Sequence, residues 1–120
     1  MILVDTSVWI DHFRNDNQEL KKLLTDDEVI CHPFIIGELA CGNLKNRKEI
    51  IVLLQALSMV DTVENNEILL FIENHKLMGR GLGLIDVQLL SSALLNNVLL
   101  WTLDKKLKQE AMKLDIGYKY

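Results

Sequence analysis

The sequence predicts one α/β domain with three layers, in which helices cover both faces of a parallel sheet of about five strands. Short apolar runs alternate with longer amphipathic segments along the whole chain. This alternation is typical of folds in which a helix connects each parallel strand to the next. The 120 residues include one proline and no low-complexity tract. We therefore expect residues 1–120 to form a single domain, which is long enough to bury a core.

Five short segments are predicted as strands, because each is too brief for a helix and is bounded by polar or turn-forming residues. They are residues 1–4, 28–31, 59–61, 98–101 and 116–118. The first and fourth are wholly apolar, as expected for strands that are buried on both faces of a sheet. The last is expected to lie at an edge.

The segments between these strands are predicted as helices, because their apolar residues recur at helical spacing. They span residues 8–13, 18–24, 34–41, 47–57, 66–78, 84–95 and 104–114. Ser7, Asn46 and Asp104 are the expected N-caps of the first, fourth and last of them. Gly79 to Gly83 is expected to be a loop.

Composition narrows the classes of function. The net charge of −4 lacks the basic excess that is typical of nucleic-acid binders, although cations held by clustered carboxylates would change the local field. No apolar run is long enough to span a bilayer, and the first residues do not resemble a signal peptide. Cys31 and Cys41 match no metal-binding spacing and are expected to be small core residues in a reducing compartment. We expect a cytoplasmic protein with no membrane partner.

Four acids lie among apolar residues, where a carboxylate needs an explanation. They are Asp5, Glu38, Asp86 and Asp104. Three of them have a structural alternative: Asp5 and Asp104 as helix caps, and Asp86 as a charge in the first turn of its helix. Glu38 is the hardest of the four to explain by a structural role alone, because its neighbours one turn away are apolar or small.

The positions of these acids suggest a shared site. Asp5 and Asp104 follow strands, and ligands of parallel α/β sheets bind beyond the carboxyl ends of strands. The possible ligands are all oxygens, which favours Mg²⁺ or Mn²⁺. Such a site typically activates water and stabilises charge on a phosphate that is being cleaved.

Four segments of the chain resemble the signature segments of PIN-domain nucleases, and most closely the VapC-type toxins of toxin–antitoxin pairs. They are Val4–Ser7, Glu38–Gly42, Gly83–Asp86 and Leu100–Asp104. The resemblance implies a homodimeric, Mg²⁺- or Mn²⁺-dependent endoribonuclease that cleaves RNA, with tRNA and rRNA as targets in the family. It also implies a VapB-type antitoxin that silences the enzyme.

The resemblance also assigns roles to residues. It implies that the four acids bind metal and that the hydroxyl groups of Thr6 and Thr102 line the site. One departure concerns Lys105 and Lys106, which stand where many relatives carry a further acid or Asn. A second metal ion is therefore not implied.

Two further groups complete the predicted site. Arg80, Lys105 and Lys106 are predicted to position phosphates of the RNA, with ordinary solvated side chains as the alternative. Trp9 and Phe13 lie one turn apart and are predicted to line a groove for the antitoxin, with core packing as the alternative.

Two other classes of function stay open from the residues alone. A metal-dependent phosphatase of the haloacid dehalogenase type also opens with an acid after its first strand, but Ser7 stands where it needs a second acid. A non-catalytic α/β binding module is the other alternative, and it would bind no Mg²⁺.

Overall fold

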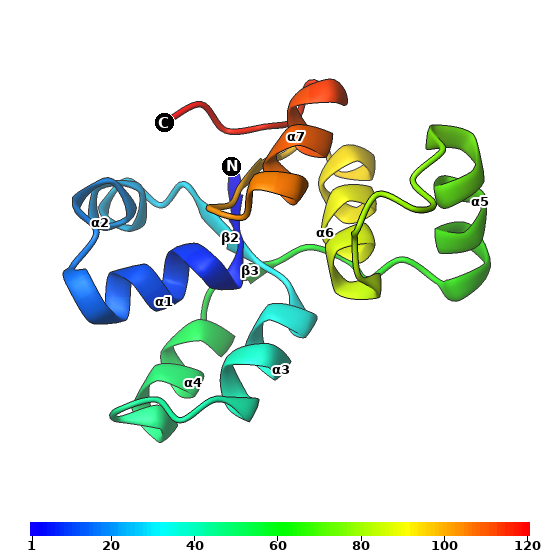
Figure 1. Ribbon diagram of the computed structural model, residues 1–120. Helices are drawn as coiled ribbons and strands as arrows, with labels where there is room; N and C mark the ends of the chain where they lie inside the picture. The colour runs from blue at the N-terminus through cyan, green and yellow to red at the C-terminus, as the bar shows by residue number, and fades with distance from the viewer.

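A computed structural model describes residues 1–120. Its centre is a four-stranded, wholly parallel sheet in the order β3-β2-β1-β4. The strands are β1 (Ile2–Val4), β2 (Val29–Cys31), β3 (Ser58–Met59) and β4 (Leu99–Trp101). The predicted parallel α/β architecture is therefore confirmed, with four strands where about five were expected (Figure 1).

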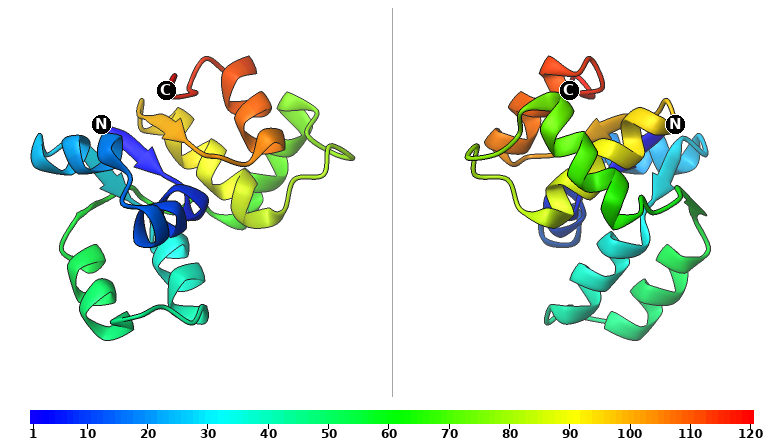
Figure 2. Two further views of the ribbon diagram at one scale, coloured as in Figure 1. Left: turned by 60° about the vertical axis from the view of Figure 1, so that its left-hand side comes forward. Right: turned by 90° about the vertical axis from the view of Figure 1, so that its right-hand side faces the viewer.

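Seven helices surround the sheet. They are α1 (Thr6–Asn15), α2 (Gln18–Thr25), α3 (Pro33–Cys41), α4 (Arg47–Gln55), α5 (Asn65–His75), α6 (Leu84–Leu95) and α7 (Lys105–Lys113). Helices α1 and α2 lie on one side of the sheet, and α5, α6 and α7 lie on the other (Figure 1). Helices α3 and α4 pack together as a hairpin that projects away from the sheet (Figure 2).

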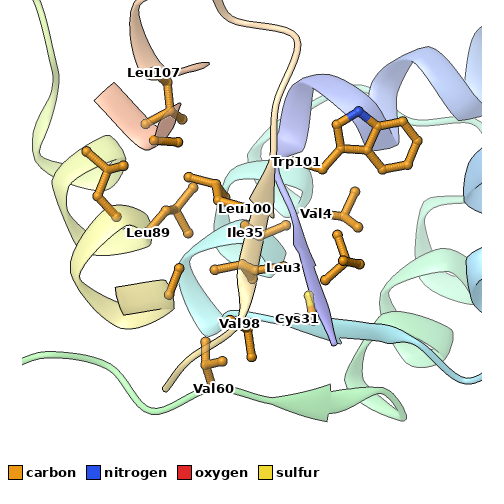
Figure 3. Close-up of a cluster of buried hydrophobic side chains, with 14 of the residues drawn as sticks. Leu3, Val4, Cys31, Ile35, Val60, Leu89, Val98, Leu100, Trp101 and Leu107 are labelled. Carbon is orange, nitrogen blue, oxygen red and sulfur yellow. The ribbon is translucent and has the colours of Figure 1, made fainter. Parts of the chain in front are cut away.

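The core forms on both faces of the neighbouring strands β1 and β4. Strand β1 is buried along its whole length, and its register pairs Leu3 with Leu100 and Val4 with Trp101. Figure 3 shows Val4 and Trp101 on one side of these strands, while Leu89 of α6 and Leu107 of α7 lie on the other. A strand that is buried on both faces needs apolar residues at every position, which explains the unbroken apolar run before Asp5.

The chain reverses its direction of growth beside β1. It adds β2 and then β3 on one side of β1, and returns through α5 and α6 to place β4 on the other side. In open α/β sheets such a reversal opens a crevice at the carboxyl ends of the two strands that flank it. Here those strands are β1, which is followed directly by Asp5, and β4, which is followed directly by Thr102.

The predicted fifth strand is the main difference in the sheet. Residues 116–118 form only one isolated parallel bridge, between Leu100 and Gly117. Ile116 and Tyr118 each share one backbone hydrogen bond with Leu100. The left-handed backbone of Asp115 (φ 58°) interrupts the extended conformation immediately before Ile116. The predicted helix 66–78 also ends early, because Lys76 is left-handed and closes α5.

Two smaller predictions are wrong. Asp5, not Ser7, is the N-cap residue of α1, because the helix already includes Thr6 and Ser7. Cys41 is exposed and not in the core, whereas Cys31 is buried as predicted; both thiols are free. No helix in the structure is both long enough and apolar enough to cross a membrane.

Candidate functional site at the ends of β1 and β4

Asp5 lies at the floor of the crevice and is held by two hydroxyl groups, one from the first turn of α1 and one from the residue that follows β4. Asp5 is only 7% exposed. Ser7 Oγ and Thr102 Oγ1 each donate a hydrogen bond of 2.7 Å to the same carboxylate oxygen, Asp5 Oδ2. The backbone N–H of Asp5 donates to Trp101 O at 2.9 Å. The carboxylate is therefore fixed by both its main chain and its side chain.

Thr102 and Ser7 connect this carboxylate to the start of α7. Thr102 Oγ1 accepts a hydrogen bond of 3.1 Å from the N–H of Asp104, and Ser7 Oγ accepts one of 3.0 Å from Leu103. Thr102 was predicted to line the site, and the structure brings it to Asp5. Ser7 was interpreted only as a helix cap; its place two residues after an acid at a strand end was the signal for a site role.

Glu38 reaches the site through Thr6. The Thr6 hydroxyl donates a hydrogen bond of 2.7 Å to Glu38 Oε1, across 32 residues of sequence. The helix that carries Glu38 begins after His32, whose ring accepts from Phe34 N, and it has proline in its first turn. Glu38 is exposed, and it lines a shallow pocket together with Ile85, the residue before Asp86. Glu38 and Thr6 therefore lie at the rim of the crevice.

Asp86 lies in the first turn of α6, where its Oδ2 accepts a hydrogen bond of 2.9 Å from Gly83 N. Burial raises the pKa of Asp86, and the negative charges of Asp5 and Asp104 raise it further, against the hydrogen bond from Gly83. Asp104 is the N-cap of α7, and its Oδ1 accepts from Leu107 N at 3.0 Å. The cap interpretation of Asp104 is thus correct, and it also contributes to the field at Asp86.

The four acids, which we call the acid site, share one feature. Each uses one carboxylate oxygen in a hydrogen bond within the chain, and its second oxygen accepts none. The only fully buried side-chain polar atom without a partner is Trp9 Nε1, so the free oxygen of Asp5 is accessible. The members of the acid site are Asp5, Glu38, Asp86 and Asp104.

The donor chemistry fits a cation that prefers oxygen. Mg²⁺ keeps several water ligands and often binds through only one or two carboxylates. The side chains as they stand do not gather three acidic, histidine or cysteine groups around one point. Negative charges that raise the pKa of a neighbouring carboxyl are relieved by a bound cation, so the acid site fits Mg²⁺ or Mn²⁺ with water completing the coordination.

The predicted cations lie in different surroundings. Arg80 is engaged: its Nη1 lies 3.2 Å from Glu110 Oε1, and its Nε donates to Lys76 O. Lys105 and Lys106 follow Asp104 in the first turn of α7, are exposed, and form no ion pair. Of these three predicted phosphate contacts, only Lys105 and Lys106 are therefore without an ion-pair partner and free to meet an incoming anion.

An apolar groove of about 290 Å³ runs between α1 and α4. Trp9 is buried and stacks on Phe13 with their rings 6.0 Å apart. Core packing is therefore correct for Trp9, while Phe13 is partly exposed. The groove is lined by Trp9, His12, Phe13, Leu24, Ile50, Leu53, Leu54 and Leu57.

A crevice with carboxylates at the reversal point of a parallel sheet defines a class of α/β proteins that bind their ligands at strand ends. The PIN domain family model matches residues 2–111 of the chain. The chain is also 49% identical over 109 residues to Ribonuclease VapC32 of Mycobacterium tuberculosis, from strain CDC 1551 / Oshkosh and from strain ATCC 25618 / H37Rv. That match covers 90% of this chain and 88% of each relative.

A solved structure has the same fold. The crystal structure of PAE2754 from Pyrobaculum aerophilum aligns with a TM-score of 0.66 over 95% of this chain and 94% of that chain, at 14% identity. The chain therefore belongs to the PIN-domain family and is of the VapC type.

Proposed function

We propose that this protein is a metal-dependent endoribonuclease that acts as the toxin of a toxin–antitoxin pair and cleaves an RNA, such as a tRNA or rRNA, to stop translation. The observation that carries the proposal is the placement of Asp5 and Asp104 after the carboxyl ends of the neighbouring strands β1 and β4. Asp86 lies near enough for both charges to raise its pKa, and Glu38 is bonded to Thr6, the residue after Asp5. The similarity to a protein named a ribonuclease supports the choice of RNA as substrate. The cytoplasm, where such RNAs occur, is the proposed location.

Each residue of the acid site has a proposed role. Asp5, Glu38 and Asp86 would hold the ion through their free oxygens, directly or through water, and Asp104 helps hold it or orients the attacking water. Thr102 and Thr6 fix the carboxylates of Asp5 and Glu38 by hydrogen bonds. A bound Mg²⁺ or Mn²⁺ supplies a lowered pKa for the attacking water and offsets charge that develops on the phosphate.

The test is incubation of the purified protein with total RNA in Mg²⁺ or in EDTA, with new 5′ ends mapped by sequencing. We expect discrete cuts in Mg²⁺ and none in EDTA. Asp5→Ala and Asp86→Ala should abolish the cuts and keep the far-ultraviolet circular dichroism spectrum. Asp26→Ala is the matched control, because this exposed acid precedes β2 and so lies at the opposite end of the sheet. Cleavage at the wild-type rate by either acid-site variant would refute the assignment.

Lys105 and Lys106 are proposed to hold phosphates of the RNA next to the acid site. Their support is their position beside Asp104 and their lack of an ion pair. Removing one phosphate contact should lower the slope of log affinity against log salt by roughly 0.7 for single-stranded nucleic acid. Lys105→Ala and Lys106→Ala are therefore to be compared with Lys22→Ala, an exposed lysine on α2.

The groove between α1 and α4 is proposed to receive a segment of the VapB-type antitoxin, with Phe13 on its wall and Trp9 beneath. Apolar side chains line seven of its eight positions, and the buried N–H of Trp9 has no acceptor. A partner seated there should change the emission of Trp9, measured in a Trp101→Phe background. Unchanged emission on binding would remove the groove from the proposal.

A homodimer is proposed on the same resemblance. Helix α5 exposes Leu69 and Leu70, which are 54% and 62% exposed, and such apolar side chains are costly to leave in water when they lie in one patch. Light scattering of the wild type and of Leu70→Lys tests the state. A monomeric wild type at micromolar concentration would contradict it.

A further inference from the structure

The loop Gly79–Gly83, which we call the glycine loop, connects α5 to the helix that carries Asp86. Arg80 of this loop makes a half-buried ion pair with Glu110 of α7. Its Nη1 lies 3.2 Å from Oε1 and 3.5 Å from Oε2 of Glu110, whose side chain is only 7% exposed. A carboxylate at that depth is costly to leave unpaired, and Lys113 Nζ, 3.5 Å from Glu110 Oε1, is its second cationic partner.

The same guanidinium also ties the end of α5 into this contact. Arg80 Nε donates a hydrogen bond of 2.9 Å to the backbone oxygen of Lys76, the left-handed residue that closes α5. Both bonds need the planar, forked donor geometry of arginine, which a lysine ammonium does not provide. Arg80 therefore joins the end of α5, the glycine loop and α7.

The loop also passes close to the first turn of α7. Gly81 has a φ of +76°, and a Cβ at this position would lie 2.6 Å from Lys106 Nζ. Lys106 and Glu110 are one helical turn apart, so they lie on the same face of α7. The glycine loop thus lies along that face, and α6 starts where the loop ends, at Leu84.

We propose that the Arg80–Glu110 pair is a positioning clamp, which fixes Asp86 relative to Asp104 by holding the glycine loop on α7. Asp86 is bonded to the last residue of the loop, Gly83, and Asp104 is the N-cap of α7. Movement of the loop away from α7 moves one carboxylate of the acid site away from the other. Arg80 thus acts through Glu110 and not by touching RNA. This inference rests on the proposed nuclease function.

The proposal is tested with a mutant cycle of Arg80→Ala, Glu110→Ala and the double variant. The double variant lacks the Glu110 carboxylate, so it leaves no buried charge unpaired. Misplacement of a reacting group should lower kcat by roughly tenfold to a hundredfold while the KM for RNA stays unchanged. All three variants should lose the same factor, because the second change removes nothing further. Arg80→Lys should rescue only part of the loss. Lys113→Ala is the matched control, because Lys113 is the other, more exposed partner of Glu110.

A measurement without RNA or metal separates this proposal from the nuclease assignment. Hydrogen exchange of the Gly83 and Val87 amides should accelerate in Arg80→Ala and Glu110→Ala but not in Lys113→Ala. Additive losses of kcat, or a raised KM with a lower salt slope in Arg80→Ala alone, would show that Arg80 contacts RNA and would overturn the clamp. Unchanged exchange in both variants would overturn it as well. A wild type that does not cleave RNA would refute the nuclease proposal but leave the exchange test intact.

Discussion

Thr102 Oγ1 donates a hydrogen bond of 2.7 Å to Asp5 Oδ2, and it joins residues that are 97 positions apart in the sequence. The two side chains follow neighbouring parallel strands, β1 and β4, whose carboxyl ends meet at one edge of the sheet. The pairing therefore links the first and the last strand of the sheet at the proposed catalytic acid. It makes Thr102 a support for the geometry of Asp5 as well as a lining residue.

Thr102→Val removes this hydroxyl and keeps the shape of the side chain. The change leaves the buried Asp5 oxygen with one donor fewer and Asp104 N without its acceptor. We expect a loss of about 1–3 kcal/mol of unfolding free energy, as for a hydrogen bond to a charged group, and a lower kcat. Urea unfolding and RNA cleavage measure the two effects. Thr62→Val, at an exposed threonine, should change neither.

Asp86→Asn should stabilise the metal-free protein at neutral pH. Burial and the charges of Asp5 and Asp104 raise the pKa of Asp86, so the fold disfavours its ionised form. A raised pKa contributes stability that is complete below the unfolded pKa, about 3.9, and is lost as the pH rises through the folded value. The asparagine avoids this loss and keeps an oxygen for Gly83 N. In EDTA, the melting temperature of Asp86→Asn should exceed that of the wild type at pH 7, and this difference should shrink as the pH is lowered.

Metal removal should destabilise the wild type through the same carboxylates. A ligand that binds only the folded state adds RT ln(1 + [L]/Kd), about 2.7 kcal/mol at a hundred times Kd. We therefore expect Mn²⁺ to raise the melting temperature of the wild type and EDTA to reverse the rise. Asp5→Ala should respond much less. An equal response in Asp5→Ala would place the ion elsewhere.

The sequence was sufficient for most of the fold because its strongest signals are local. The unbroken apolar run before Asp5 marks a strand buried on both faces, and the glycines around Arg80 mark a loop. Asp104 caps α7 through its side chain, as its position before an amphipathic run predicted. Helix boundaries were harder to predict. Helix α5 is closed by Lys76, which adopts the left-handed backbone conformation that usually marks a glycine.

The candidate site can be proposed from the residue types in the sequence, but its contacts cannot. Acids among apolar residues in the sequence pointed to Asp5, Glu38 and Asp86, because a buried carboxylate needs a reason. In the structure only Asp5 is buried, whereas Asp86 is partly buried and Glu38 is exposed. The partners of these acids come from distant positions, as in the bond of Thr6 to Glu38, and no local pattern shows them. The pairing of Arg80 with Glu110 is of the same kind, because it depends on tertiary structure, and the phosphate contact of Arg80 stays a prediction.

Leu53→Lys should weaken antitoxin binding without unfolding the protein. Leu53 is 69% exposed and lines the groove between α1 and α4. A charge there would be desolvated by an apolar segment, so we expect at least about a tenfold weaker affinity, or about 1.4 kcal/mol. Calorimetry with the product of a short gene adjacent to this one measures it. Val52→Lys is the matched control, because Val52 is 65% exposed but does not line the groove.

His32 is fully buried, and the hydrogen bonds of its ring determine which ring nitrogen carries the proton. Its Nδ1 accepts from Phe34 N at 2.9 Å, so the proton is on Nε2, which lies 3.2 Å from Ser92 Oγ. The Ser92 hydroxyl in turn donates to Asp61 O at 3.0 Å. The imidazole is therefore neutral, and it links the start of α3 to α6.

His32→Asn should reduce the acid sensitivity of the fold. Burial lowers the pKa of His32, so the unfolded chain binds a proton near pH 6.5 while the folded protein binds it only at lower pH. The stability from the neutral ring is therefore complete above about pH 6.5 and falls below it by up to about 1.4 kcal/mol per pH unit. Asparagine can still cap α3 but does not titrate, so its urea midpoint should fall less between pH 7.5 and 5 than that of the wild type. His75→Asn, outside this network, should keep the wild-type slope, and an equal slope in His32→Asn would show that other groups cause it.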